Sequence, residues 1–359
     1  MNDITDLFDN KRIDKVRYDS LLKHFKLLVT EDYEFPPEIV KVDGTTIATI
    51  GNFSASTGKP KSKKTFNVSA IVASFLSGKE VLRYKAFVPP NKRRVLYIDT
   101  EQSKCHCHKV LERILRLAGL PTNEECDLID FFVLREYSPD QRRDIINWAL
   151  HEERHYGLVV IDGIRDLIRD INSPSESLDI INELMRWSSY YELHIHTVLH
   201  LNKGDDNTRG HVGTELNNKA ETVLQISKCA ENGNISEVKA MHIRDKEFAS
   251  FAFQIGTDAL PYLVENHEFK LSKRERTAPL TSLGEKQHRQ ALQIVFGETE
   301  SMGYQQLIEA LRKGYHEIGY TRGRNTMVNL AKFLLQQNAL VKNDKQYSYN
   351  PGFTIQSKV

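Results

Sequence analysis

Cysteine is scarce in this sequence, and long apolar runs are missing. The 359 residues include four cysteines, and none of them forms a CxxC pair. A disulfide framework or a paired zinc knuckle is therefore not expected, and the thiols are expected to be reduced. No stretch approaches the ~20 apolar residues of a membrane span, and the first residues, MNDITDLFDNKR, lack the apolar core of a signal peptide. We expect a cytoplasmic protein with no membrane partner.

An excess of charge of one sign is also missing. The chain has 49 Lys and Arg residues against 48 Asp and Glu residues, a formal net charge of +1. No global basic field therefore indicates nucleic acid, although a local asymmetry remains open. Hydrophobic residues make up 40% of the chain and charged residues 27%, a balance typical of globular proteins. The length exceeds that of most compact domains, so two domains are expected.

The order of apolar patterns predicts an α/β protein with a separate C-terminal unit. Helical periodicity marks residues 3–28, and from residue 45 onward short apolar runs alternate with helical stretches. This alternation is typical of a mainly parallel sheet with helices on both faces. Helices are expected over 64–77, 103–118, 139–154 and 176–191. Strands are expected in IATIGNFSAST (with a turn inside it), RVLYIDT, DFFVLRE, GLVVIDG, HIHTVLHLN, AETVLQIS, VKAMHIR and SFAFQIG.

Domain boundaries follow from the same patterns. The polar stretch 272–284, SKRERTAPLTSLG, indicates a linker. Residues 1–35 form an N-terminal helical segment, and residues 36–271 form the α/β domain. Residues 285–359 contain three expected helices and a hairpin, a combination that suggests a winged helix-turn-helix. GRNTMVNLAKFLLQQ is the candidate recognition helix of that unit.

The stretch GNFSASTGKPKSKKTF, residues 51–66, offers two frames for a phosphate loop. Such a loop requires the pattern G-x-x-x-x-G-K-[ST] between a strand and a helix. In the first frame Lys59 would be the lysine, but Phe53 then replaces a glycine and Pro60 replaces the hydroxyl residue. Proline supplies neither a hydroxyl nor a backbone donor. The first frame is therefore rejected.

The second frame keeps Gly58, Lys64 and Thr65 and lacks only the inner glycine, which is Lys63. A strand precedes it and a helix follows it, and the helix N-terminus adds partial positive charge. We therefore predict that ATP is bound here, with Mg²⁺ on Thr65. The alternative is a basic loop that binds no nucleotide. The predicted nucleotide-binding residues are Gly58, Lys59, Pro60, Lys61, Ser62, Lys63, Lys64, Thr65 and Phe66.

Polar residues at the ends of other strands complete the expected site. Asp162 ends the apolar strand YGLVVID and is the predicted Mg²⁺ partner. Glu101 lies beyond the end of RVLYIDT and is predicted to activate the attacking water, with Asp99 as the reserve or as a helix cap. Asn202, next to His200, is a candidate sensor of the γ-phosphate; the histidines of that strand are otherwise core or surface residues.

Three further features have open interpretations. Arg244 and Lys246 are either fingers that reach a neighbouring subunit's γ-phosphate or solvated charges. KGDDNTRGHVGTEL, residues 203–216, is expected to be a mobile loop at the functional edge, able to touch a nucleic-acid backbone. The stretch from Cys105 to His108 resembles a metal cluster, but four successive helical residues do not converge, and no second pair completes a zinc site.

The order of these motifs resembles the RecA-like core, in particular the RepA and DnaB type of hexameric ATPase carried by plasmids and mobilisable elements. The resemblance covers roughly residues 36–265. It implies Mg²⁺-ATP hydrolysis at subunit interfaces by Lys64, Glu101, Asn202, Arg244 and Lys246. It further implies a homo-oligomeric, hexameric ring around single-stranded DNA, working with replication or mobilisation proteins. Lys63 departs from the pattern and bears on hydrolysis more than on binding.

Three functions are consistent with this sequence. The first is an ATP-driven helicase or loader in plasmid replication or element mobilisation. The second is an ATP-gated DNA-binding or regulatory protein with little or no unwinding activity. The third is a small-molecule kinase, against which the basic candidates Arg244 and Lys246 and the winged unit both argue.

Overall fold

The computed structural model describes residues 25–201, 210–269, 279–297 and 299–354. The chain divides into two compact units, Met1–His267 and Glu268–Val359. Within the described residues, no helix is long and apolar enough to cross a membrane. Each unit has its own hydrophobic core.

A nine-stranded sheet forms the centre of the first unit, counted over its described residues. Its order is β12-β11-β10-β9-β3-β8-β7-β5-β6, and the strands from β9 to β6 run parallel. The remaining three strands are antiparallel and extend the sheet beyond β9. The bounds are β3 Phe53–Gly58, β5 Arg94–Asp99, β6 Ile129–Val133, β7 Tyr156–Asp162, β8 His194–His200, β9 Thr222–Lys228, β10 Ile235–Ile243, β11 Phe251–Ile255 and β12 Pro261–Leu263.

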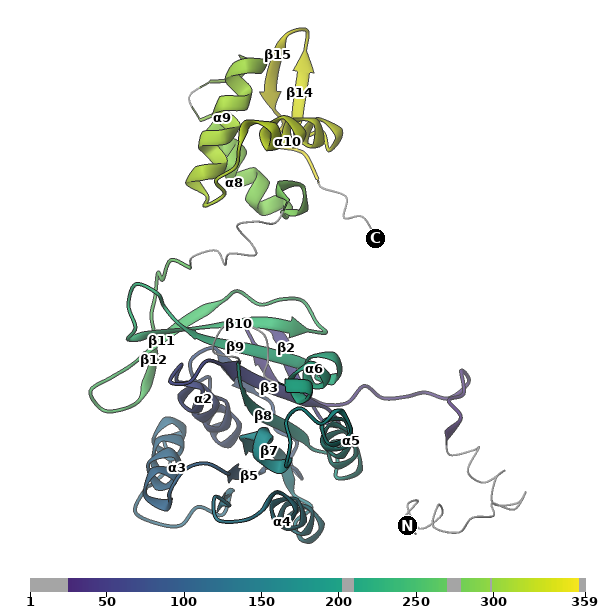
Figure 1. The fold of residues 1–359 in the computed structure, drawn as a ribbon, viewed down its shortest axis with the longest axis vertical. Coiled ribbons are helices and arrows are strands. Elements are labelled where there is room, and N and C mark those ends of the chain that lie inside the picture. Colours follow the sequence, from purple (N-terminus) through teal and green to yellow (C-terminus); the bar gives the residue numbers. More distant parts are fainter. Residues whose placement is uncertain (1–24, 202–209, 270–278, 298, 355–359) are drawn as a thin grey trace. The chain divides into compact units, whose positions relative to one another are not determined.

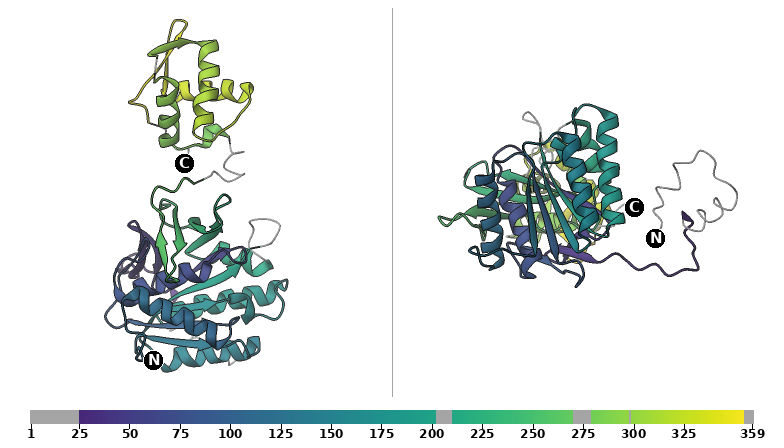
Figure 2. Two further views of the ribbon diagram at one scale, coloured as in Figure 1. Left: turned by 90° about the vertical axis from the view of Figure 1, so that its left-hand side faces the viewer. Right: turned by 90° about the horizontal axis from the view of Figure 1, so that it is seen from below.

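Helices cover both faces of this sheet (Figure 1). On one face, α2 (Lys64–Ser77) and α3 (Lys104–Ala118) pack against one core. On the other face, α4 (Pro139–Glu152), α5 (Pro174–Tyr190) and α6 (Gly210–Lys219) pack against a second core. The further views show the parallel strands enclosed between these two helical layers (Figure 2). The predicted α/β class, with a mainly parallel sheet and helices on both faces, is confirmed.

The two cores are divided by the alternation of side chains along each strand. In β7, Leu158 and Val160 point into one core, whereas Val159 and Ile161 point into the other. All seven residues of β7 are buried. A strand covered on both faces needs apolar residues at every position, which is why YGLVVID is nearly uninterrupted.

The stretch IATIGNFSAST forms two strands in two different sheets, not one strand with an internal turn. β2 (Thr45–Thr49) pairs with β1 (Glu38–Val42), which also pairs with β4 (Tyr84–Ala86). Gly51 lies between β2 and β3 with φ at 80°, a left-handed conformation that glycine adopts without steric cost. This turn sends the chain from the small sheet into the central one.

The expectation of a loop over residues 203–216 is wrong for its second half. Gly210–Lys219 forms the helix α6, with Val212 and Leu216 fully buried against the second core. These two residues are four apart and therefore lie on one helical face. Residues 203–209 lie outside the described residues, as do residues 3–24 of the helical segment expected over 3–28 and part of the expected linker. Residues 26–28, the described end of that segment, are not helical.

The second unit contains α8 (Glu285–Val295), α9 (Tyr304–Glu317) and α10 (Arg324–Gln336). Strands β14 (Leu340–Asn343) and β15 (Gln346–Tyr349) form the hairpin expected from the sequence, and β13 (Ser301–Gly303) adds a third strand to it. A 3-10 turn, η3 (Leu280–Ser282), precedes α8. Leu307, Leu311, Met327 and Leu334 are fully buried and hold α9 against α10.

Candidate functional site

The residues of the second frame form the connection between β3 and α2. Gly58 ends β3, and α2 begins at Lys64. A Cβ atom on Gly58 would lie 2.2 Å from the carbonyl oxygen of Ile226 and 2.5 Å from the Ser62 hydroxyl. Only glycine fits there, because the loop turns back against β9 at that point. Gly58 is thus fixed by close approach of the backbone, as the first anchor of a phosphate loop requires.

Lys64 is buried with its ammonium group held at the loop. Its Nζ donates to the carbonyl oxygens of Gly58, at 2.9 Å, and Lys59, at 3.2 Å, and lies 3.0 Å from Nδ1 of His200. Burial lowers the pKa of Lys64 to about 8, against the opposing attraction of Asp162 and Glu101. A bound anion would stabilise the charged form of this buried ammonium, because the anion replaces the solvation that burial removes.

The side chains of Thr65 and Asp162 place two oxygen atoms that could bind a metal ion side by side. The Thr65 hydroxyl donates to Oδ2 of Asp162 at 3.2 Å, and the Tyr97 hydroxyl donates to the same oxygen at 3.1 Å. Burial raises the pKa of Asp162 to about 6, and the neighbouring Asp99 adds to the shift. Hydroxyl and carboxylate oxygens are the donors that Mg²⁺ takes beside a phosphate. These residues therefore fit a Mg²⁺-nucleotide, with Thr65 and Asp162 on the metal side.

Glu101 lies beside the same opening, next to His200. Oε1 of Glu101 is 3.6 Å from Nε2 of His200, and this contact lowers the pKa of Glu101. The opposite ring nitrogen of His200 faces Lys64, so the imidazole lies between the Lys64 ammonium and the Glu101 carboxylate. A carboxylate that stays ionised beside the phosphate loop can accept a proton from water.

Asp99 has a different role from Glu101. Its Oδ1 accepts hydrogen bonds from the backbone N–H groups of Glu101, at 3.0 Å, and Gln102, at 2.7 Å. Its Oδ2 accepts from the Gln102 side chain at 2.7 Å. Asp99 therefore holds the turn that presents Glu101, and its own oxygens are occupied by that turn.

Lys63 occupies the place of the missing inner glycine in a left-handed conformation, with φ at 68°. Its Nζ donates to the backbone oxygen of Asn234, in the turn between β9 and β10. Glycine is the usual residue at such an angle. Lys63 thus keeps the backbone shape that glycine would supply, and its side chain reaches the β9–β10 turn.

A cavity of about 350 Å³ opens over these residues, a size within the range of small-ligand sites. Its second wall is α3. His106, Lys109 and Arg113 follow one another at helical spacing along the face of α3 that lines it. The Arg113 guanidinium lies 3.6 Å from the centre of the Phe66 ring, and burial lowers the Arg113 pKa.

Sequence reasoning missed this wall of α3. Its signal is present in the sequence, because the three basic residues of α3 are spaced so that they share one helical face. The neighbouring run from Cys105 to His108 does not form a cluster. In the helix these four residues point in different directions: Cys105 is exposed and Cys107 is buried. Tyr97, whose hydroxyl donates to Asp162, carries no motif signal and resembles an ordinary strand residue in the sequence.

Other predicted residues lie apart from the cavity lining. The side chains of Lys59 and Pro60 are exposed, and the loop uses the Lys59 backbone oxygen. Arg244 and Lys246 are exposed beyond the end of β10, where Arg244 donates to the backbone oxygen of Lys219 at 3.1 Å. Asn202 lies outside the described residues. Within the described part of the chain, the cavity combines a phosphate loop, a metal-side carboxylate and an ionised glutamate.

A mainly parallel sheet with these groups at the carboxyl ends of its strands is the arrangement of a phosphate-loop nucleotide-binding protein. A family model described as an AAA domain matches residues 20–206, more than half of the chain. The chain belongs to this AAA-domain family. No curated protein matches it. A solved structure, the crystal structure of the RadB recombinase, is 17% identical, with a TM-score of 0.44 over 60% of this chain and 91% of that one.

Proposed function

We propose that the chain is a Mg²⁺-dependent ATPase that acts on DNA, as a RepA-like helicase or loader in plasmid replication or element mobilisation. The observation that carries the ATPase part is the convergence of Lys64, Thr65, Asp162 and Glu101 on one cavity. In this proposal the Lys64 ammonium neutralises the phosphates and Thr65 with Asp162 holds Mg²⁺. Glu101 orients and deprotonates water, with Asn202 as sensor.

The DNA part is supported by the surface of α10. Asn325, Asn329, Lys332 and Gln336 are exposed and lie four, three and four residues apart, which places them on one polar face of the helix. Amide and ammonium side chains are the groups that read base edges or contact phosphates. In this proposal α10 is the recognition helix of a winged helix-turn-helix, with β14 and β15 as its wing.

Nucleotide binding is tested first, on the full chain with a fluorescent ATP analogue. Lys64→Ala removes the buried ammonium, so we expect affinity to fall by at least about tenfold, since a charge-assisted hydrogen bond contributes about 1.5–3 kcal/mol. Lys59→Ala is the matched control and keeps most of the affinity, because its side chain is exposed. The reverse pattern would mean that Lys59 belongs to the working frame.

DNA action is tested by ATPase activity with and without single-stranded DNA, followed by strand displacement. The proposal expects stimulation by DNA and displacement of a paired strand. Stimulation without displacement favours the alternative, an ATP-gated DNA-binding or regulatory protein. Lys332→Ala should weaken DNA binding by roughly fivefold or more, while Lys286→Ala on α8 removes the same charge elsewhere. Phosphate transfer to a metabolite without any effect of DNA would overturn both DNA functions.

A further inference from the structure

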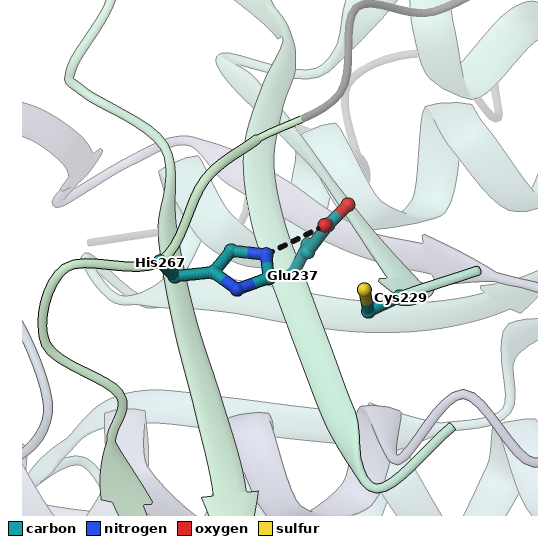
Figure 3. Close-up of side chains that lie close together, drawn as sticks. All are labelled: Cys229, Glu237 and His267. Atoms are coloured by element: carbon teal, nitrogen blue, oxygen red, sulfur yellow. Dashed lines mark hydrogen bonds and ion pairs between the residues drawn. The ribbon is translucent and has the colours of Figure 1, made fainter. Parts of the chain in front are cut away.

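Three side chains of different chemistry meet away from the nucleotide cavity, at the antiparallel end of the central sheet. Cys229 follows β9 directly, Glu237 lies on β10, and His267 follows β12. One sulfur, one carboxylate oxygen and one ring nitrogen all lie within 4.8 Å of one another. Figure 3 shows the imidazole of His267 turned toward the Glu237 carboxylate, with Cys229 on the adjacent segment.

The pairing of the strands brings these residues to one face. The backbone N–H of Cys229 donates to the oxygen of Ile235, and Ile235 and Glu237 are two residues apart on β10. Residues two apart in a strand share a face. On the other side, Glu237 is paired with Ala252, whose oxygen accepts from the N–H of Val264. The chain leaving β12 therefore passes beside Glu237 and delivers His267 to it.

The site is shielded and already partly ordered. The His267 side chain is 9% exposed and that of Glu237 is 23% exposed. Nε2 of His267 lies 2.8 Å from Oε1 of Glu237, which fixes the ring and the carboxylate relative to each other. Cys229 is half-buried at the third corner. A thiol, an imidazole and a carboxylate that are held together and partly buried form a set of possible metal ligands.

The identity of the donors selects the metal. Mg²⁺ and Ca²⁺ prefer oxygen ligands, so a site that offers a cysteine sulfur and a histidine nitrogen does not suit either ion. Zn²⁺ accepts thiolate, imidazole and carboxylate together, with bonds of about 2.0–2.3 Å. Tetrahedral bonds of that length place ligand atoms roughly 3.3–3.7 Å apart. The ligand atoms here lie within 4.8 Å of one another. To bind the ion, the 2.8 Å contact between His267 and Glu237 would open and the Cys229 sulfur would approach by side-chain rotation.

We propose that Cys229, Glu237 and His267 bind Zn²⁺, with a fourth position open to water. The ion would tie the segment after β12 to the β9–β10 hairpin. That hairpin also touches the phosphate loop, because its Asn234 oxygen accepts from Lys63 and its Ser236 hydroxyl donates to the oxygen of Ser62. The zinc site is separate from the Mg²⁺ side of the nucleotide cavity and does not depend on the proposed ATPase function.

The test is a titration of the reduced, nucleotide-free full chain with Co²⁺, which takes the place of zinc and reports on its ligands. We expect one Co²⁺ per chain, with the near-ultraviolet charge-transfer band of a thiolate ligand. Cys229→Ser should abolish this band. A cobalt ion held by Thr65 and Asp162 would show no such band, because neither carries sulfur.

The second cysteine- and histidine-containing stretch supplies the control. Cys105→Ser with His108→Gln removes two potential ligands from α3 and should leave the band intact. His267→Gln should weaken zinc affinity by about 100-fold or more, since even residues outside the ligand sphere change affinity by about 10–100-fold. Zinc should raise the Tm of the wild-type chain and not that of Cys229→Ser. An unchanged cobalt band in Cys229→Ser, or a wild-type chain that binds neither ion, would overturn the proposal.

Discussion

At the scale of single residues, burial moves the pKa values of the two central groups of the cavity in opposite directions. The pKa of Lys64 falls to about 8, and that of Asp162 rises to about 6. Both shifts disfavour the charged form, which is the form that each group needs. Nucleotide phosphate needs the ammonium, and Mg²⁺ needs the carboxylate. The free protein therefore has both groups in their working state only between these two values.

This arrangement predicts a bell-shaped dependence of kcat/KM for Mg²⁺-ATP on pH. As pH falls through about 6, Asp162 takes up a proton and loses its hold on the metal. As pH rises through about 8, Lys64 loses its proton and its attraction for phosphate. Each limb should approach about a tenfold loss per pH unit, because kcat/KM reports the free enzyme. The measurement is a steady-state ATPase profile at constant ionic strength.

The basic limb is assigned to Lys64 by the variant Lys64→Arg. A guanidinium stays charged across this range, so the basic limb should disappear even though the wrong side-chain shape lowers the rate. If Lys64→Arg keeps the same basic limb, the group that titrates is another one. Asp162→Asn tests the acidic limb in the same way, because it removes the group that is proposed to titrate there. We expect this variant to lose both the acidic limb and the dependence of the rate on Mg²⁺.

Lys63 shows how a residue can depart from a motif and keep its geometry. It adopts a left-handed conformation and directs its ammonium to Asn234. Lys63→Gly and Lys63→Ala both remove the ammonium, but only glycine relieves the backbone. We therefore expect the free energy of unfolding of the glycine variant to exceed that of the alanine variant by about 1 kcal/mol. The measurement is urea unfolding in the absence of nucleotide.

The same pair of variants tests turnover. A faster ATPase in Lys63→Gly than in the wild type would show that the contact between Lys63 and the β9–β10 turn restrains the phosphate loop. Equal rates would show that Lys63 only shapes the loop. Equal stability of the two variants would contradict the assignment of strain to the left-handed angle.

At the scale of elements, Arg142 of α4 ties together the turns beyond β5, β6 and β7. The buried guanidinium donates to the backbone oxygens of Leu134, Thr100, Arg135 and Asp166. Thr100 directly precedes Glu101. A helix on one face of the sheet thus supports the turn that presents the proposed catalytic carboxylate.

Arg142→Ala should lower the free energy of unfolding by about 3 kcal/mol or more, because several buried carbonyl oxygens lose their donor. ATPase activity should fall further than ATP binding, since Glu101 loses support while the phosphate loop does not. Arg143→Ala is the matched control: its ion pairs with Asp140 and Glu183 are at the surface, where such pairs contribute less than about 1 kcal/mol. Equal effects of both variants would contradict this role of Arg142.

Elements whose ends carry clear signals could be predicted from the sequence, and elements without such signals could not. The expected helix over 64–77 is α2, because its start is set by the phosphate loop and its end by Gly78 in a left-handed conformation. By contrast, α6 has only two fully buried apolar residues and contains glycine, so its pattern resembled a loop. The split between β2 and β3 depends on sheet pairing, which local sequence does not encode.

The same distinction holds for the candidate site. Residues at strand ends could be placed together, because the carboxyl ends of parallel strands meet at one edge. The contact of His200 with both Lys64 and Glu101 could not, since it joins residues that are 136 and 99 positions apart through side-chain orientation. The stacking of Arg113 on Phe66 depends in the same way on how α3 packs beside α2.

At the scale of the whole molecule, a head-to-tail ring of the kind that the resemblance implies would place each nucleotide site between two chains. Arg244 and Lys246 do not line the cavity of their own chain. Asp245 between them anchors this corner, because its Oδ2 accepts from the backbone N–H of Thr46 on β2. Two exposed cations on a fixed turn are suited to reach a neighbouring chain's nucleotide, as a head-to-tail ring would require.

Mixing two inactive variants separates a finger in trans from a surface charge. Glu101→Gln keeps ATP binding and lacks the proposed base, while Arg244→Ala with Lys246→Ala lacks the fingers; each alone should lose at least about 100-fold in turnover. In a random equal mixture, roughly a quarter of head-to-tail interfaces combine an intact site with an intact finger. Activity should then recover to about that fraction of the wild-type rate. Recovery should vanish on dilution below the assembly concentration, and a mixture as inactive as its components would remove the fingers in trans, leaving Arg244 and Lys246 as solvated charges.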